Sequence, residues 1–457
     1  MRFLNRNEDA LVMRLAWPCV IENISATMVS LVDTAMVGSL GAVATAAVGV
    51  CASPSWLMNG LVQALGIGGT ALVARAIGAG EMREAEHVGR QVFRVAVLMA
   101  FAVMCVMFFG APLIPVIMSA KPEVYEDATA YMRIVSVCYL FHYTGMAMGA
   151  MLRGAGDTKT PMTAGILANV LNVIGNFLLI YEPRTVSLFG LSLNVWGAGM
   201  GVRGAAAASA AAMGAAGLYV LARMFGKKSA LKLGFSFRER WDTAVLRRVA
   251  RIGTPAALER MAINLGQMVF AAMIAAVGTV EVAAYHIAIN VEGLGYMPAY
   301  GFSAAATTLV GQKLGAKAPD EAARLGRRCI HLSLALLTVV GVAMWLSSGW
   351  LASLFSPDQA VVAVAGAFIA ICAAEQPFNA ISIVASGALR GAGDTVKPFV
   401  YGLITMWGVR ILGAWLFGVR LGMGVLVIFW AMVADLGVRS LLLYVRFLHG
   451  KWKHARV

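Results

Sequence analysis

The sequence predicts an all-α polytopic membrane protein with twelve transmembrane helices in two pseudo-symmetric six-helix lobes. The first observation is composition: 60% of the 457 residues are hydrophobic and 13% are charged, whereas soluble chains carry about 25% charged residues. The second is a repeat, because the ten residues 152–161 return as 389–398 with eight identities. The chain therefore contains one fold twice. The same offset of 237 residues pairs Pro18 with Pro255, Glu22 with Glu259, Gly41 with Gly278, Gly78 with Gly315 and Arg90 with Arg327.

Each transmembrane element is predicted from a run of about 20 apolar residues, the length that crosses a bilayer. We predict an N-lobe at 1–226, an inter-lobe linker at 227–252 and a C-lobe at 253–457. The six helices of the N-lobe are expected near 16–38, 45–74, 95–118, 128–152, 161–181 and 201–224. Those of the C-lobe are expected near 253–277, 281–312, 330–355, 360–388, 398–418 and 423–446.

The repeated Leu-Arg-Gly-Ala-Gly-Asp-Thr segments are predicted to be turns between helices. Asp157 or Asp394 is placed to cap the next helix, whose first turn holds Pro161 or Pro398. The segments lack the GKS or GKT end of a phosphate loop, and the GxGxxG match at 199–204 follows no predicted strand. These glycine patterns therefore predict no nucleotide site.

Basic residues gather on one side of the predicted spans, which sets the orientation by the positive-inside rule. The opposite loops are short or acidic, as at Glu123, Glu126 and Asp127. We expect a multi-pass inner-membrane protein with both termini and the linker in the cytoplasm. The net charge of +14 then follows from topology, and no nucleic-acid partner is expected. The basic residues are Arg75, Arg83, Arg90, Arg94, Lys227, Lys228, Lys232, Arg238, Arg240, Arg247, Arg248, Arg251, Lys313, Lys317, Arg324, Arg327 and Arg328.

The linker has two interpretations. Trp241, Val245, Leu246 and Val249 recur at helical spacing opposite arginines, which is typical of a helix lying in the headgroup interface. A solvated basic connector fits the composition equally well.

Neither a cleaved signal peptide nor a metal or redox site is expected. The first apolar run follows a charged stretch and is long enough to span the membrane. The six cysteines lie in or beside apolar spans without CxxC spacing, so they are interpreted as small buried hydrophobic residues. We infer no cofactor.

In the first half, we expect functional residues to be polar side chains within the apolar spans. An ionisable side chain inside the membrane costs free energy and usually has a function there. Asp33 lies well inside the first helix, fifteen residues after the helix-breaking Pro18. Asn169, Asn172 and Asn176 are spaced i, i+3, i+7 on the fifth helix and share one face. These amides could bind a carboxylate or a cation, or they could join helices by hydrogen bonds. Asp33 could likewise have a structural role only, as a hydrogen-bond partner of a neighbouring hydroxyl or amide.

In the second half, carboxylates occupy other places. Glu292 and Glu375 each precede a proline, whose kink frees backbone carbonyls that can line a cavity. Glu259 lies one turn after Pro255, near the cytoplasmic end of its predicted helix, and could be exposed to water at the membrane surface. These residues are candidates for a substrate cavity, together with Gln267 and with the repeat mates His142 and Asn379, although His142 is favoured as a buried structural histidine.

The chain resembles the multidrug and toxic compound extrusion (MATE) family of cation-coupled antiporters over nearly its whole length. The resemblance rests on Val32–Gly38 after Pro18, on Thr308–Gly315, and on Arg410 in the eleventh helix. It also rests on the paired Leu-Arg-Gly-Ala-Gly-Asp-Thr turns and the fifth-helix asparagines. The family implies two six-helix lobes about a pseudo-twofold axis along the membrane normal, with a V-shaped central cavity.

The resemblance implies roles for particular residues. Asp33 matches the first-helix acid of the family, which is its proton or cation site, and Asn172 and Asn176 match the fifth-helix partners. Archaeal members have Asp where this chain has Asn176, so the resemblance favours proton coupling over Na⁺ coupling. The C-lobe acids of NorM-type members fall here on Asn379 and near Ile263, so that site is not reproduced.

The function expected is export of organic cations or lipophilic drugs in exchange for H⁺, with Na⁺ as the alternative ion. We expect rocker-type alternating access by a monomer in the lipid bilayer, in which protonation of Asp33 releases the drug outward. A flippase for lipid-linked saccharides or peptidoglycan precursors is the alternative, but it would require basic groups for a pyrophosphate. An enzyme is not expected, because no nucleophile–base set stands out.

Overall fold

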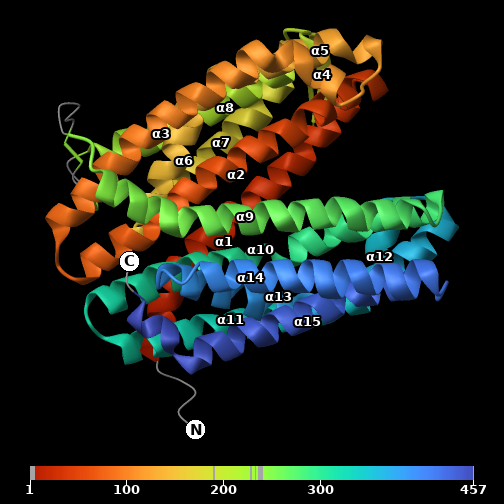
Figure 1. Ribbon diagram of the computed structural model, residues 1–457. Helices are drawn as coiled ribbons and strands as arrows, with labels where there is room; N and C mark the ends of the chain where they lie inside the picture. Colours follow the sequence, from red (N-terminus) through yellow and green to blue (C-terminus); the bar gives the residue numbers. More distant parts are fainter. Residues whose placement is uncertain (1–5, 189–190, 227–228, 232, 235–239, 456–457) are drawn as a thin grey trace. The chain divides into compact units, whose positions relative to one another are not determined.

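The computed structural model describes residues 6–188, 191–226, 229–231, 233–234 and 240–455, and it confirms the all-α prediction (Figure 1). Six spans make up the first half, with the fourth divided into two helices. Their bounds are α1 Arg6–Gly38, α2 Ala42–Gly78, α3 Met82–Gly110 with the short α4 Ile114–Ile117, α5 Tyr125–Val137, α6 Tyr139–Gly154, α7 Lys159–Leu179 and α8 Gly201–Met224.

The second half repeats this order with six more spans. They are α9 Thr243–Ala275, α10 Thr279–Gly315, α11 Pro319–Leu346 with the short α12 Ser348–Ser353, α13 Gln359–Gly391, α14 Val396–Ile404 and α15 Val425–His449. Two π-helical stretches, Thr405–Ile411 and Ala414–Arg420, continue α14 to the end of the eleventh span. A 3₁₀ turn at Lys451–His454 follows α15.

Two spans are less apolar than the rest. Within the described chain, nine helices are long and apolar enough to cross a membrane, and the pair α5 and α6, bent by 53°, makes a tenth. The helices outside this set are α9 and α10, because polar residues such as Arg260, Gln267 and Glu292 interrupt them. The least apolar spans are thus among those that carry second-half candidates.

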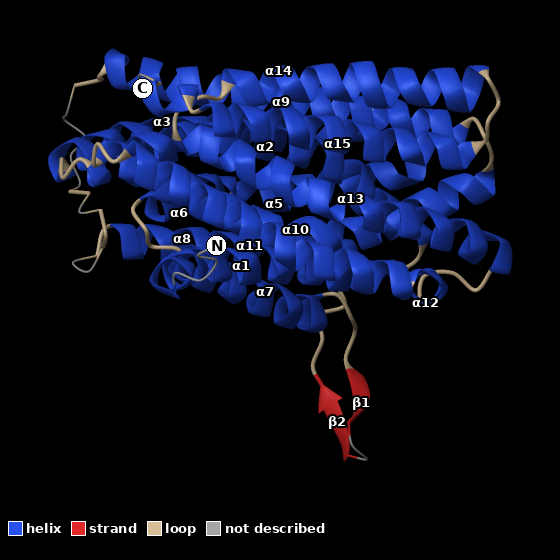
Figure 2. Cartoon of the chain, turned by 90° about the horizontal axis from the view of Figure 1, so that it is seen from below, coloured by secondary structure: helices blue, strands red, loops and turns tan. Residues whose placement is uncertain are grey.

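A β-hairpin was not predicted. Strands β1 Arg184–Leu188 and β2 Leu191–Val195 pair antiparallel, with Arg184 opposite Val195 and Leu188 opposite Leu191. They extend away from the neighbouring helices after α7 (Figure 2). Apolar residues alternate along both segments, a period-two pattern that is typical of strands and short enough to be missed.

The chain forms two compact units. Unit 1 contains residues 1–23, 70–82 and 248–457, and unit 2 contains 24–69 and 83–247. The start of α1 and the end of α2 therefore pack with the second half of the sequence. Within unit 1, the side chains of Val12 and Ala16 join a buried core with Phe302, Leu309 and Val384.

The sequence repeat is visible as reciprocal contacts inside unit 1. A Cβ on Gly78 would collide with the carbonyl oxygen of Gln312, and a Cβ on Gly315 would collide with that of Arg75. Gln312 is the repeat mate of Arg75, so each half presents the same residues to the other. Gly311 lies against its own mate Ala74, because a Cβ added at Gly311 would lie 2.9 Å from the Cβ of Ala74. These positions mark a local pseudo-twofold axis between the ends of α2 and α10.

The turns after α6 and α13 differ although their sequences repeat. Asp157 caps α7, because its carboxylate accepts hydrogen bonds from the Thr160 amide at 3.0 Å and the Thr160 hydroxyl at 2.6 Å. Asp394 makes no such cap and pairs instead with Arg446 of α15 at 2.7 Å. The predicted cap is therefore confirmed at Asp157 and wrong at Asp394, where the guanidinium competes for the carboxylate.

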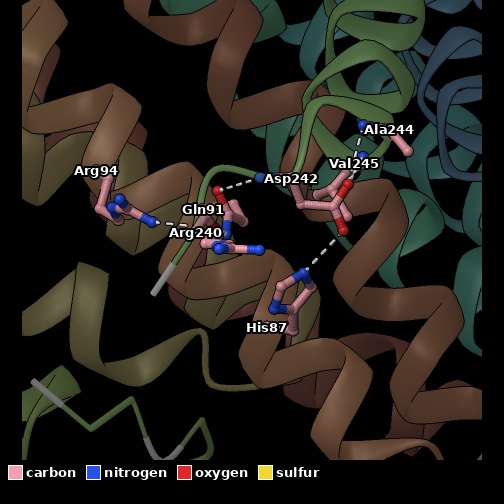
Figure 3. Close-up of polar contacts among 7 residues, drawn as sticks. All are labelled: His87, Gln91, Arg94, Arg240, Asp242, Ala244 and Val245. Carbon is pink, nitrogen blue, oxygen red and sulfur yellow. Dashed lines mark hydrogen bonds and ion pairs between the residues drawn. The ribbon is translucent and has the colours of Figure 1, made fainter. Parts of the chain in front are cut away.

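The described end of the linker is docked on α3 (Figure 3). The carboxylate of Asp242 accepts hydrogen bonds from the amides of Ala244 and Val245 at 2.9 and 3.1 Å, which caps α9. Its other oxygen lies 3.1 Å from Nε2 of His87. The hydrogen bond with His87, assisted by the Val245 amide, lowers the pKa of Asp242. Gln91 donates to the Arg240 carbonyl at 3.0 Å.

At the described end of the linker, from Arg240 on, neither interpretation holds. Val245 and Val249 are buried in the first turns of α9, which continues without a break into the seventh span, so there is no separate interfacial helix at 243–252. Trp241 instead lies beneath the guanidinium of Arg94, 4.1 Å from the ring centroid. Lys227, Lys228, Lys232 and Arg238 lie outside the described residues.

Candidate functional site

The first-half candidates meet in unit 2 around Asp33. This residue lies on α1 five positions before the helix ends and is half-buried. Its Oδ1 accepts a hydrogen bond from Nδ2 of Asn176, on α7, at 2.6 Å. A carboxylate that accepts a hydrogen bond from a fully buried amide is held at a fixed place.

A chain of amides continues from Asp33 into the helices behind it. Nδ2 of Asn176 also approaches Oδ1 of Asn172 at 3.3 Å, and Nδ2 of Asn172 donates to Oγ of Ser209 on α8 at 3.0 Å. The i, i+4 spacing of the two asparagines puts both on the face that meets α1 and α8.

Two buried polar atoms of this set have no hydrogen-bond partner among the described residues. They are Oδ1 of Asn176 and Nδ2 of Asn169. The free Oδ1 of Asn176 and the carboxylate of Asp33 are oxygen ligands, the type that hard cations and protons prefer. The arrangement can hold a proton on Asp33 or a small cation beside it.

The second-half candidates divide into two groups within unit 1. Glu259 is buried and accepts an ion-paired hydrogen bond from Nη2 of Arg390, on α13, at 2.7 Å. Glu292 of α10 and Glu375 of α13 instead approach each other, and the side chain of Cys372 completes a buried group whose ligand atoms lie within 4.8 Å of one another. No spacing in the sequence indicates that Cys372 lies beside two acids.

The remaining candidates are placed separately. Oε1 of Gln267 and Nδ2 of Asn379 are buried without a partner among the described residues. Asn379 lies one turn after Glu375, on the same face of α13. His142 is partly buried on α6, with its ring 5.1 Å from that of Tyr143. Pro18 is buried inside α1, which continues as one helix from Arg6 to Gly38.

Sequence reasoning missed Asp435 and Ser209. Asp435 is fully buried on α15 and pairs with Arg410 at 2.8 Å and with Arg439 at 2.8 Å. Its signal was the i, i+4 spacing to Arg439, a pairing that helices favour. Ser209 carries the one hydroxyl group in the alanine run 205–212, and a single polar residue in such a run indicates a candidate functional residue.

Fold and site together define a helical membrane protein with a polar group buried in each of two repeated halves. The MatE family model matches twice, at residues 18–178 and 255–416, and its two start points differ by the repeat offset of 237 residues. The chain belongs to the MatE family of membrane transporters, as its motifs predicted.

Named relatives cover the chain almost completely. It is 29% identical to a probable multidrug resistance protein NorM of Thermotoga maritima, over 98% of this chain and 93% of that one. It is 27% identical to the multidrug resistance protein MdtK of Yersinia pestis, over 90% and 88%. A solved structure of the Vibrio cholerae MATE transporter VcmN in a bent form superposes with a TM-score of 0.85 at 20% identity, over 97% of each chain. That likeness establishes the shared twelve-helix, two-lobe fold.

Proposed function

We propose that this protein is a secondary active antiporter of the inner membrane that exports organic cations and lipophilic drugs in exchange for protons. The observation that carries the proposal is the hydrogen bond between Asp33 and Asn176, which fixes a carboxylate within a predicted membrane span. The multidrug resistance proteins NorM and MdtK among the relatives support drugs as the substrate class.

The proposed cycle uses the charge of Asp33. In the ionised state its carboxylate attracts a cationic drug, and the amide of Asn176 stabilises that charge by hydrogen bonding. Protonation from the acidic side removes the charge, so the drug is released there. Access to Asp33 alternates between the two sides because the protonated and ionised states favour different conformations. Pro18, which removes one backbone hydrogen bond from α1, is the proposed hinge.

Protons are proposed as the coupling ion in preference to Na⁺. A neutral amide at Asn176 leaves Asp33 as the one carboxylate among the described contacts of this site. A single carboxylate can take up and release one proton without further ligands. We also propose that the monomer is the transporting unit and that both termini face the cytoplasm.

The test is drug efflux from proteoliposomes under imposed gradients. With the wild type, efflux should collapse when the pH gradient is removed and should not respond to a Na⁺ gradient alone. Asp33→Asn keeps size and hydrogen bonding but fixes the site as neutral, so we expect normal folding and a loss of gradient-driven efflux of at least about tenfold.

Glu22→Gln is the control for a first-helix acid outside the site and should transport normally. If Asp33→Asn still concentrates drug against its gradient with normal pH dependence, Asp33 is not the coupling residue. Full-rate transport driven by Na⁺ alone would instead assign the ion as sodium.

A further inference from the structure

The seventh span carries an arginine that has no ion pair among the described residues. Arg260 lies on α9, within the predicted span 253–277, and is exposed. Its one hydrogen bond in the described chain runs from Nη1 to the hydroxyl of Tyr300, on α10, at 3.2 Å. The adjacent Glu259 does not serve as its counter-ion, because that carboxylate is paired with Arg390 at 2.7 Å. A charged guanidinium within a membrane span is costly in lipid, so Arg260 is expected to face water.

The exposed side of α9 is divided into an apolar and a polar stripe. Met261, Leu265 and Met268 are exposed and share one face, which suits contact with lipid. Arg260 and Asn264 are exposed on the neighbouring face, one turn apart. The arginine thus lies outside the apolar stripe.

The open face of α10, beside this polar stripe, is polar as well. His286 and Asn290 are exposed, and Tyr300 lies half-exposed on the same face, nearly four helical turns after His286. Polar side chains on the open face of a membrane helix face water, because lipid offers them no hydrogen-bond partners. The contact with Tyr300 therefore holds the guanidinium of Arg260 at a wet surface within the membrane.

The groups around this guanidinium fit an aromatic carboxylate. Arginine has five N–H donors, and one of them is used on Tyr300. The others include a pair that matches the two oxygens of a carboxylate. The rings of Tyr296 and Tyr300 lie with centroids 6.0 Å apart, and Cζ of Arg260 lies 6.0 Å from the centroid of Tyr300. Aromatic rings next to a cation favour a ligand that carries both a ring and a negative charge.

We propose that Arg260 binds the carboxylate of aromatic compounds, with Tyr300 as the residue that positions it and Tyr296 beside the bound ring. This site goes beyond the proposed export of cations, because an unpaired guanidinium repels a cationic drug. It extends the compounds that the protein binds to aromatic zwitterions and anions. The inference rests on the proposed function only in that compounds bound at Arg260 are then exported.

The repeat places no arginine at the corresponding position of the first half. The repeat mates of Arg260 and Tyr300 are Asn23 and Gln63, which are neutral amides. Neither can neutralise a carboxylate. Recognition of the anion is thus specific to the second half, and it can be measured without a signal from Asp33.

The experiment compares two fluorescent probes, rhodamine B and its ethyl ester. Both carry the same aromatic cation, but rhodamine B also has a free carboxylate. Their binding to the purified protein in detergent is titrated by fluorescence polarisation at neutral pH. We expect the wild type to bind rhodamine B about tenfold more tightly than the ester, the effect of one hydrogen bond to a charged group. Arg260→Gln should abolish this preference by weakening the binding of rhodamine B alone.

Matched variants separate recognition from folding. Arg251→Gln removes an exposed arginine of the same helix outside the predicted span and should keep the preference. Arg260→Lys keeps the charge but loses the paired donors, so the preference should fall several-fold. Tyr300→Phe should also reduce it, because the guanidinium is no longer held. Thermal unfolding in detergent checks that each variant is folded, and if Arg260→Gln fails to fold, Arg260→Lys decides.

Several results would overturn the proposal. They are equal binding of the two probes by the wild type, absence of binding of either, and a loss in Arg260→Gln that affects both probes equally. Displacement of rhodamine B by inorganic phosphate and not by benzoate would also overturn it, since the site would then be a phosphate site. The preference should persist in the Asp33→Asn protein. Normal export by Asp33→Asn would contradict the proposed function without changing this binding result.

Discussion

At the scale of single residues, the two halves differ most at their polar sites. The repeat mate of Asp33 is Phe270, which is fully buried and lies against the rings of Tyr285 and Phe429, each with centroids 6.2 Å away. A carboxylate in one half thus corresponds to the centre of an aromatic cluster in the other. Since the repeat mates of Asp33, Glu292 and Glu375 are not acids, a substitution at one of these positions cannot be compensated by its mate.

The close contact at Gly78 leads to a stability prediction. Gly78→Ala should lower the thermal stability, because the new methyl group meets the backbone carbonyl of Gln312, which cannot rotate away. Overpacking of this kind costs about 1–3 kcal/mol. Thermal unfolding in detergent would measure the change.

Gly60→Ala in the same helix is the control, since nothing lies within 4 Å of its added Cβ. There alanine should be neutral or stabilise by up to about 1 kcal/mol through helix propensity. Equal stability of both variants would show that α2 and α10 are not in tight contact at Gly78.

The first-half site was predictable from the sequence because it depends on local spacing. Asn172 and Asn176 share a face by helical periodicity, and Asp33 is the one acid in the second half of α1. The second-half pair was not predictable, because Glu292 and Glu375 come from helices whose rotation only packing decides. Periodicity along one helix cannot report which face of another helix it meets.

At the scale of elements, the docked start of α9 should respond to pH. The pKa of Asp242 is lowered in the folded protein, chiefly by the hydrogen bond with His87. Its stabilisation is therefore present above the unfolded value of about 3.9 and is lost as the pH falls through the lower folded value. Asp242→Asn, which keeps a capping oxygen, should be less stable than the wild type at neutral pH.

The difference between Asp242→Asn and the wild type should shrink in strong acid, as measured by thermal unfolding across pH. Asp358→Asn is the matched control, because Asp358 caps α13 through the Ala360 amide at 2.9 Å and has no ion pair among the described residues. Its effect should be small at every pH. A pH-independent loss at Asp242 would mean that the contact with His87 contributes nothing.

The last turn of the described chain is predicted to be part of the fold. Trp452 is fully buried, stacks on Phe447 with ring centroids 5.0 Å apart, and donates from Nε1 to the Phe447 carbonyl at 2.7 Å. Trp452→Ala should cost about 3–5 kcal/mol of stability, measured by thermal unfolding. Lys451→Ala, at an exposed neighbour, should have little effect, and equal losses would contradict this role.

Element boundaries were predicted better where apolarity alone decides them. The sixth and twelfth spans lie within a few residues of their predicted ends, whereas the fourth is broken between Val137 and Tyr139 by a 53° bend. The eleventh is partly π-helical. Both features change backbone geometry without changing composition, so an apolar run cannot reveal them. The α3 and α11 helices start well before their predicted spans because their polar first turns are still helical.

At the scale of the whole molecule, the proposed topology can be mapped with single cysteines in a background lacking the six native ones. Glu81→Cys and Lys451→Cys should react with a membrane-impermeant maleimide only after cells are broken. Glu123→Cys and Ser356→Cys should react in intact cells. Labelling of Lys451→Cys from outside would place the C-terminus in the wrong compartment and reverse the proposed orientation.

The compact units locate where α1 and α2 can bend. The unit boundary crosses α1 after Asn23, and it crosses α2 after Gly69, next to Gly66 and Gly68. Glycines in a helix interior cost about 1 kcal/mol each relative to alanine, so their presence favours a backbone that changes shape there. Gly66 and Gly69 also approach Ala150 and Met151 of α6, which gives them a packing role within unit 2.

The reciprocity of Gly78 with Gln312 and of Gly315 with Arg75 is the geometry of a homodimer. In a twofold assembly of identical subunits, a residue near the axis meets its own copy. Ala74 meets its repeat mate Gly311 in this way, and the two residues differ by one methyl group. The contact between the ends of α2 and α10 thus has, within one polypeptide, the symmetry of an interface between two identical subunits. This symmetry does not extend to the polar sites, because the repeat mates of Asp33, Glu292 and Glu375 are not acids.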